Sequence, residues 1–296
     1  MVVSGTTCRK RITHLLLANN GSSGASCSGK TLLSKHIRRA LPQGAKIIHQ
    51  DDFCPPAEEV PYSKQYPDLQ DWDDPDTCIL WPQFRSTLDQ VRKSGGHDSH
   101  PTHDHLNKEV KIDVQPGVFD KWRSEFERLK ATEREKGTEL VVYIVDGFVL
   151  YYDPAVVDNL DIRIFLRVPR DILQSRREER QVYVLQPGDV WVDPPGYFGK
   201  IVWPGYIKAH QHIFEPITDS APKDDHSSAD GTAELQQGEV FGKKLKKGWG
   251  PEGRGLVVVE PEDGEKGMTT AFDKACSAII DALRKGAGTA IAATIS

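Results

Sequence analysis

The stretch Gly24-Ala25-Ser26-Cys27-Ser28-Gly29-Lys30-Thr31 decides the fold that this sequence predicts. It fits G-x-x-x-x-G-K-[ST], the P-loop pattern, in which backbone N–H groups wrap the phosphates of a nucleotide. In such a loop the lysine reaches the β- and γ-phosphates and the next hydroxyl binds Mg²⁺, so we expect these roles for Lys30 and Thr31. The alternative is a linker rich in glycine and serine that contains a lysine by accident.

The residues around the P-loop follow the order of strand, loop and helix that phosphate binding needs. Residues 12–17 are an apolar run typical of a buried strand. Residues 32–41 place leucine and isoleucine side chains near one stripe of a helix, and Pro42 ends that helix. Residues 18–23 are unusually polar for the end of a central strand, so the strand either ends early or shifts its register there.

The composition argues against several classes of function. With 296 residues and a net charge of −5, nothing favours broad binding to nucleic acid or to a membrane surface. No apolar stretch approaches the ~18 residues that a membrane-spanning helix needs. The five cysteines are scattered without a C-x-x-C pair, so we expect neither a disulfide framework nor a zinc site. We expect a cytoplasmic protein that is a monomer or a weak homodimer.

Short apolar runs alternate with amphipathic segments, which predicts an α/β fold with a five-stranded parallel sheet. The expected strands are residues 12–17, 45–49, 139–148, 161–168 and 256–259. The expected helices are residues 32–41, 79–93, 121–136, 169–180, roughly 204–215 and 270–283, with a frayed tail after them. Asp51, Asp52 and Asp146 lie at or just after strand ends, so they should meet the P-loop at the carboxyl edge of the sheet.

Two polar segments, at about residues 94–137 and 216–255, are expected to be insertions in a single domain that spans residues 1–296. The first contains four histidines, between His97 and His105, which form either a metal site or part of a solvated loop. The loop is favoured, because no helix or strand fixes the ligand geometry there. The second, expected to be largely disordered, carries a lysine run at 243–247 that is either a nuclear signal or a linker.

Three features favour a small-molecule kinase. The acidic pair Asp51 and Asp52 would lie near the γ-phosphate, where an acceptor hydroxyl must lose its proton. Arginines at 176, 177 and 180 suit the negative charge that spreads in phosphoryl transfer. The segment 187–204, rich in glycine, proline and aromatic residues, is typical of a mobile cover that excludes water. A GTPase would carry N-K-x-D, and this sequence has none.

The sequence resembles the nicotinamide riboside kinases, and their fungal members in particular. The resemblance rests on blocks at residues 24–31, 50–53, 71–73, 145–148, 176–183 and 193–204. It covers roughly residues 12–93, 138–215 and 256–284 and implies a three-layer P-loop fold like that of the nucleoside monophosphate kinases, with a lid at about residues 176–204. It also implies ATP and Mg²⁺ as cofactors and nicotinamide riboside as the small-molecule substrate, with nicotinic acid riboside as a second one.

The resemblance implies a role for each matching residue. The catalytic residues would be Asp51, as the base for the ribose 5′-hydroxyl, and Lys30. The metal would be held by Thr31, Asp51 and Asp146. The nucleotide would be bound by Gly24, Ala25, Ser26, Cys27, Ser28, Gly29, Lys30, Thr31, Arg176, Arg180, Lys266 and Gly267. The substrate would be bound by Asp51, Asp52, Phe53, Cys54, Trp72, Asp73, Arg177, Tyr183 and Val184. Trp72 would stack on the nicotinamide ring, and Asp73 would grip the ribose 2′- and 3′-hydroxyls.

Alternatives remain for the main residues and for the whole chain. Asp51 is either the base or only a metal-positioning group, because phosphoryl transfer depends little on strong base catalysis. Trp72 is either a stacking group or a core residue, and Arg177 either faces the substrate or pairs with Glu178 and Glu179 on a surface helix. The chain is then either a riboside kinase, a kinase for uridine or a pantothenate-type alcohol, or a non-catalytic nucleotide-binding module.

Overall fold

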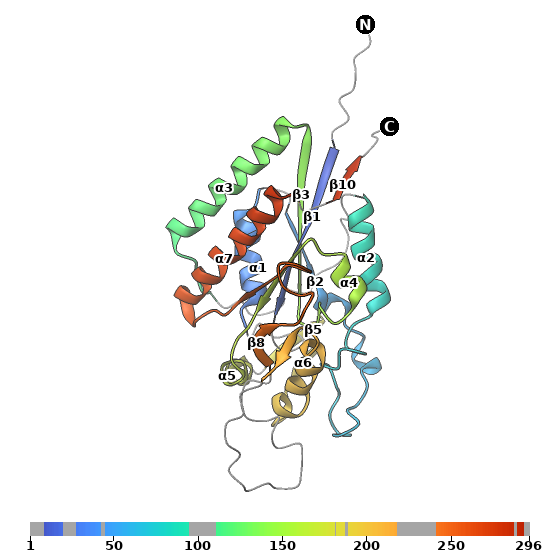
Figure 1. The fold of residues 1–296 in the computed structure, drawn as a ribbon. Helices are drawn as coiled ribbons and strands as arrows, with labels where there is room; N and C mark the ends of the chain where they lie inside the picture. The colour runs from blue at the N-terminus through green and yellow to red at the C-terminus, as the bar shows by residue number, and fades with distance from the viewer. Residues whose placement is uncertain are drawn as a thin grey trace.

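The computed structural model describes residues 9–19, 28–42, 45–94, 111–180, 182–186, 189–217, 241–286 and 289–292. They form an α/β fold around one six-stranded sheet (Figure 1). Its strands are β1 (Arg9–Asn19), β2 (Lys46–His49), β3 (Thr138–Gly147), β4 (Ile162–Leu166), β9 (Leu256–Val259) and β10 (Thr289–Ala292). Within this part of the chain, no helix is long and apolar enough to cross a membrane.

The order β2-β3-β1-β4-β9 is formed by parallel pairings throughout. β1 pairs with β3 without a register shift from Arg9 to Ala18, so the polar lead-in to the P-loop begins inside the strand and does not end it early. Residues 20–27 lie outside the described residues.

The sixth strand, β10, is missing from the sequence prediction, which has a frayed tail there. β4 pairs only with residues 15–19 of β1, which leaves the backbone groups at the start of β1 open on that side. β10 pairs antiparallel with residues 9–12 of β1 and fills this position. Main-chain hydrogen bonds form this pairing, and the short run of small residues at 289–292 gives little sign of it.

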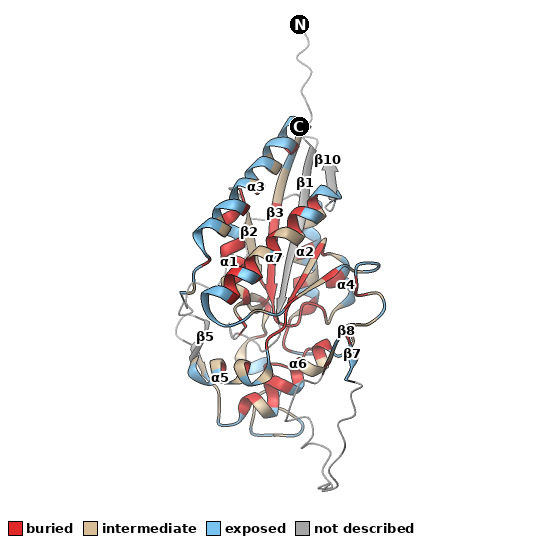
Figure 2. Ribbon diagram, turned by 60° about the vertical axis from the view of Figure 1, so that its left-hand side comes forward, coloured by how far each residue is buried: buried red, intermediate tan, exposed pale blue. Residues whose placement is uncertain are grey.

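Helices cover both faces of the sheet (Figures 1 and 2). On one face lie α1 (Lys30–Ala40), α3 (Pro116–Glu135) and α7 (Gly264–Arg284), and on the other α2 (Trp81–Ser94) and α4 (Pro154–Asp158). Side chains of β4 alternate between the two layers. Ile164 belongs to the core cluster on the face covered by α1, α3 and α7, and Phe165 to the cluster on the face covered by α2 and α4. α7 begins six residues before the helix predicted from Thr270.

Most of the remaining elements lie beyond the carboxyl ends of the parallel strands. They are α5 (Arg170–Arg180), β5 (Val182–Gln186), β6 (Asp189–Val192), the π-helical turn η4 (Phe198–Val202), α6 (Trp203–His210), β7 (Phe214–Pro216) and β8 (Phe241–Leu245). Figure 1 shows α5, α6, β5 and β8 together at the end of the molecule opposite β10. The predicted helix at 204–215 is therefore too long: it ends at His210, and the chain then enters β7, which pairs with β8.

Both segments expected to be insertions contain parts of the core. α3 buries Trp122 and Phe126 against the sheet layer, so this helix is not only a solvated face. In the second segment, β8 pairs with β7, and Trp249 is 4% exposed. The expected disorder is therefore wrong for residues 241–255, whose aromatic side chains pack in the cluster on the α2 face. The four histidines and residues 218–240 lie outside the described residues.

Candidate active site

The described half of the P-loop ends in a turn that requires glycine. Gly29 is the N-cap of α1 with φ 85°, in the left-handed region that side chains with a Cβ rarely adopt. A Cβ at this position would also lie 3.2 Å from Cε of Met268 on α7. Ser28 and Lys30 on either side are buried. The N-terminus of α1 therefore opens onto the carboxyl edge of the sheet, where its N–H groups favour an anion.

A carboxylate cluster lies beside this helix N-terminus. Asp146 is the second-last residue of β3 and stands opposite His49, the last residue of β2. His49 Nδ1 lies 3.2 Å from Asp146 Oδ2. The Thr31 hydroxyl donates to the same carboxylate, and Lys30 is close enough to act electrostatically on both Asp146 and Asp51. The structure thus brings together the P-loop lysine, the P-loop threonine and both predicted metal-site aspartates.

The pKa values of the two aspartates shift in opposite directions. Burial is the largest effect on Asp51 and raises its pKa, and the positive charge of Lys30 offsets this only in part. Burial also raises the pKa of Asp146, but the hydrogen bond from His49 and the charge of Lys30 outweigh it, so this pKa is lowered. Of the two carboxylates, Asp51 therefore takes up a proton more readily than Asp146.

The oxygen atoms of this cluster fit a divalent cation. Asp51 Oδ1 and Asp146 Oδ1 are buried and have no hydrogen-bond partner among the described residues. Together with the Thr31 hydroxyl, they offer the hard oxygen ligands that Mg²⁺ prefers, and Mg²⁺ usually binds through one or two carboxylates and several waters. The described residues contain no group of three or more His, Cys, Asp or Glu arranged to hold a metal ion.

Gln50 is a positioning residue that the sequence reasoning missed, although it lies in one of the quoted blocks. It is fully buried, and its Oε1 accepts hydrogen bonds from the backbone N–H groups of Phe148 and Val149, both at 3.0 Å. These residues follow Asp146 by two and three positions. Gln50 approaches Gly147 so closely that a Cβ added to Gly147 would lie 2.5 Å from the Cβ of Gln50. The end of β3 is therefore fixed by the residue that precedes Asp51.

The predicted acceptor residues lie next to the carboxylate cluster. Phe53 packs against Phe84 with ring centroids 4.9 Å apart, and Asp73 is 2% exposed. Burial raises the pKa of the Cys54 thiol well above its usual value, and the charges of Asp51 and Asp73 add to this. Cys54 therefore lies near both carboxylates, and the structure brings the Asp51 and Asp73 segments to one site.

Trp72 is a buried side chain with an aromatic neighbour from the predicted lid. Its ring centroid lies 5.8 Å from that of Trp191 in β6, with an interplanar angle of 56°. Its Nε1 has no hydrogen-bond partner among the described residues. Trp191 was also missed by the sequence reasoning, because only its place in an aromatic-rich segment pointed to it.

The three predicted arginines have different environments. Arg177 is buried, bonds Asp193 through Nε and through Nη2 at 3.0 Å, and lies 5.7 Å from the ring centroid of Tyr197. It is therefore not a surface residue paired with Glu178 and Glu179. Arg176 pairs with Asp263, and Arg180 is half-buried. The backbone of β5 places Tyr183 opposite Trp191 in β6. The side chains of Tyr183 and Val184 lie outside the described residues.

The first turn of α7 meets the P-loop side of the site. Lys266 is exposed and bonds Glu262 at 2.8 Å, whereas Gly267 is buried and leaves no room for a side chain. Asp263 joins this turn to α5 through Arg176, and Met268 joins it to Gly29. The structure therefore brings the predicted nucleotide-side segments together, while Gly24, Ala25, Ser26 and Cys27 lie outside the described residues.

Comparison with known proteins gives a consistent set of relatives. No family model matches the chain. The nicotinamide riboside kinase of Schizosaccharomyces pombe is 35% identical over 194 residues, which cover 66% of this chain and 79% of that protein. The enzyme of the same name from Eremothecium gossypii is 32% identical over 66% of this chain and 76% of that protein. Human nicotinamide riboside kinase 1 is 29% identical over 65% of this chain and 76% of that protein.

Proposed function

Because this chain belongs to the nicotinamide riboside kinase family, we propose that it phosphorylates nicotinamide riboside at the ribose 5′-hydroxyl. The product is nicotinamide mononucleotide, so the reaction is a step of NAD salvage. The observation that carries the proposal is the cluster of Lys30, Asp51 and Asp146, with the segment of Trp72 and Asp73 close to it. The proposal includes a fold like that of the nucleoside monophosphate kinases, with nicotinic acid riboside as a second substrate.

The donor half of the proposed site binds ATP. Lys30 and the N–H groups at the start of α1 hold the phosphates, together with the loop residues from Gly24 to Ser28. Arg176, Arg180 and the turn at 266–267 contact the nucleotide from the other side. Thr31, Asp51 and Asp146 would hold Mg²⁺, which neutralises charge on the β- and γ-phosphates when it is bound.

The acceptor half orients the riboside and removes one proton. As the 5′-oxygen forms its bond to the γ-phosphorus, the bond from that phosphorus to the bridging oxygen of ADP breaks, and the hydroxyl proton goes to Asp51. Asp51 suits this role because burial raises its pKa and favours the proton-bound form. The reaction needs no strong base, so the main contribution of the site is to align the two oxygens.

Substrate recognition falls to the buried side chains around Trp72. The positively charged pyridinium ring would lie against the indole face, a contact worth about 0.5–2 kcal/mol. Asp73 would accept hydrogen bonds from the 2′- and 3′-hydroxyls of the ribose. The remaining walls are formed by Asp52, Phe53, Cys54, Arg177, Tyr183 and Val184.

The test compares two acceptors in the wild type and in Trp72→Ala and Trp72→Phe. We expect the wild type with Mg-ATP to phosphorylate nicotinamide riboside in preference to uridine. Trp72→Ala should lower kcat/KM for the riboside by about 2- to 30-fold, with a smaller effect on uridine, which has no cationic ring. Trp72→Phe keeps an aromatic face and should retain most of the activity. A wild type that phosphorylates uridine but not nicotinamide riboside would overturn the proposal.

A further inference from the structure

The segment that carries Trp72 and Asp73, residues 70–76, has little regular secondary structure and is called the acceptor loop below. Its internal bonds are those of a turn: Asp71 Oδ1 accepts from the backbone N–H groups of Asp73 at 3.2 Å and of Asp74 at 2.9 Å. A turn of this kind does not by itself fix the direction of two neighbouring side chains. The contacts that hold the acceptor loop therefore come from other elements.

Residues from the predicted lid to α6 contact the acceptor loop in sequence order: earlier residues contact the start of the loop, and later ones contact its end. The Tyr197 hydroxyl donates to the backbone oxygen of Gln70 at 2.8 Å and accepts from the backbone N–H of Trp72 at 3.2 Å. Further along, Gly205 in α6 approaches so closely that a Cβ there would lie 2.4 Å from the backbone oxygen of Asp73. The first half of the acceptor loop is thus held through its backbone.

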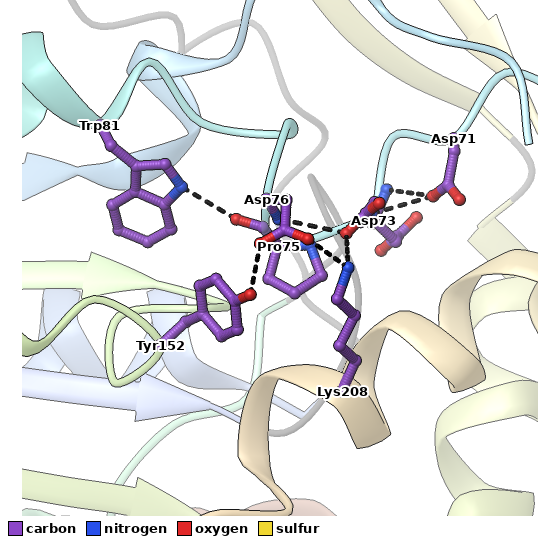
Figure 3. A network of polar contacts seen from close by, with 8 residues as sticks. Asp71, Asp73, Pro75, Asp76, Trp81, Tyr152 and Lys208 are labelled. Carbon is purple, nitrogen blue, oxygen red and sulfur yellow. Dashed lines mark hydrogen bonds and ion pairs between the residues drawn. The ribbon is translucent and has the colours of Figure 1, made fainter.

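Lys208, one turn further along α6, holds the second half through two carboxylates. Its Nζ lies 2.6 Å from Asp74 Oδ1 and 2.5 Å from Asp76 Oδ2 (Figure 3). On the far side, Tyr152 donates to Asp76, and Trp81 Nε1 donates to the backbone oxygen of Pro75 at 2.8 Å. Burial lowers the pKa of Lys208, but its hydrogen bonds to both aspartates outweigh this and raise it, so the group stays charged at neutral pH.

We infer that Lys208 is a positioning residue for the riboside site, which holds the acceptor loop in the conformation that presents Trp72 and Asp73. The inference rests on the proposed function for its substrate. Lys208 pairs with Asp74, the residue directly after Asp73, and with Asp76. Gly205 and Lys208 lie on the same helix, α6. A shift of α6 or the loss of the lysine therefore acts on the acceptor side of the site.

The test compares Lys208→Met with Lys208→Arg and with Lys121→Met. Lys121 pairs with Asp273 between α3 and α7, so its variant also loses a surface ion pair but on the other face of the sheet. We expect Lys208→Met to raise KM for the riboside by about 3- to 10-fold, with KM for ATP and kcat within about two-fold. Lys208→Arg should restore most of this loss, because its guanidinium also reaches two carboxylates.

Hydrogen exchange provides a readout that does not depend on the substrate. In Lys208→Met, exchange should become faster at the backbone N–H groups of Asp73 and Asp74 and stay unchanged in β3. A riboside KM that is unchanged in Lys208→Met, or a KM for ATP that rises equally, would overturn the inference. A wild type that is inactive on the riboside would count against the proposed function, and unchanged exchange at Asp73 and Asp74 would then still refute the positioning role.

Discussion

At the scale of single residues, the site depends on two carboxylates with opposite shifts in pKa. Asp146 is kept ionised by His49 and by the charge of Lys30, whereas burial dominates at Asp51. This division suits a group that stays charged beside a cation and a second group that accepts a proton. Each role follows from the neighbours of the side chain, since both residues are aspartates near the carboxyl end of a strand, Asp146 inside β3 and Asp51 just after β2.

Asp51→Asn tests the second role. The amide keeps the shape of the side chain but cannot take the hydroxyl proton, so we expect kcat to fall by about 100-fold or more. Steady-state kinetics with a riboside and ATP measure this. The control is Asp158→Asn, because the side chain of Asp158 is 73% exposed. If Asp51→Asn kept kcat within a few-fold of the wild type, Asp51 would be reduced to a positioning group.

The sequence identified the P-loop and the acidic strand ends because each lies in a short, contiguous pattern. It did not identify His49 as the partner of Asp146, or Gln50 as the residue that fixes the end of β3. These partners are 97 and 98 positions apart in the chain, so their contact depends on the order of the strands in the sheet. Trp191 beside Trp72 was missed for the same reason.

At the scale of elements, the close packing of α6 on the acceptor loop is the feature with the clearest consequence. A methyl group added at Gly205 would meet the backbone of Asp73, which cannot move aside as a flexible side chain can. We expect Gly205→Ala to displace the loop, to raise KM for the riboside by about 10-fold and to destabilise the protein by about 1–3 kcal/mol. Riboside kinetics and denaturant unfolding measure these effects.

Gly199→Ala is the matched control for this prediction. Gly199 lies in η4, six residues before Gly205, and a Cβ there would meet only Arg170 Nη2 at 3.9 Å, an ordinary contact. This variant should therefore behave like the wild type in both measurements. Equal effects of the two substitutions would show that the segment tolerates no change, and would remove the special role of the contact with Asp73.

Element boundaries were less predictable than element types. The periodic apolar pattern indicated α2 and the β-branched run indicated β3, and both occur in the structure. The end of α6 at His210 could not be inferred, because β7 forms only where β8 returns from 25 residues further along to pair with it. β10 was missed for a similar reason, since its partner is the other end of the chain.

At the scale of the whole molecule, the buried histidine of α6 makes stability depend on pH. His210 is fully buried, its Nδ1 is bonded to the backbone oxygen of Tyr206 at 2.8 Å, and its ring lies 5.3 Å from that of Phe165. Burial lowers its pKa to about 3, and His212 nearby adds to this. The folded protein thus keeps His210 neutral at pH values where the unfolded chain binds a proton.

His210→Phe tests this dependence. Between about pH 6.5 and pH 3 the unfolded state of the wild type binds more protons, so stability falls as the pH falls, by about 2 kcal/mol at pH 5 from this group. The phenylalanine variant lacks the titrating group, so its free energy of unfolding should change less between pH 7 and pH 5. Urea unfolding at the two pH values measures this, and equal changes in both proteins would refute it.

A deletion of residues 218–240 tests whether this segment takes part in catalysis. Pro216 and Phe241 are paired across β7 and β8, so a short turn can join Ile217 to Phe241 without moving either strand. We expect this deletion to keep riboside phosphorylation within about two-fold of the wild type. Trp249→Ala, in contrast, removes a buried side chain and should cost about 3–5 kcal/mol of stability. A loss of turnover on deletion, with stability unchanged, would show that the segment belongs to the site.

A competition between nicotinamide riboside and uridine shows which acceptor the protein phosphorylates and which oxygen receives the phosphate. Purified protein is incubated with Mg-ATP and equal concentrations of nicotinamide riboside and uridine, and the products are separated and assigned by phosphorus NMR. We expect the main product to be nicotinamide mononucleotide with its phosphate on the 5′-oxygen, and we expect Asp51→Asn to form almost none. A protein that phosphorylates uridine in preference, or that forms no phosphorylated riboside, would contradict the proposed function.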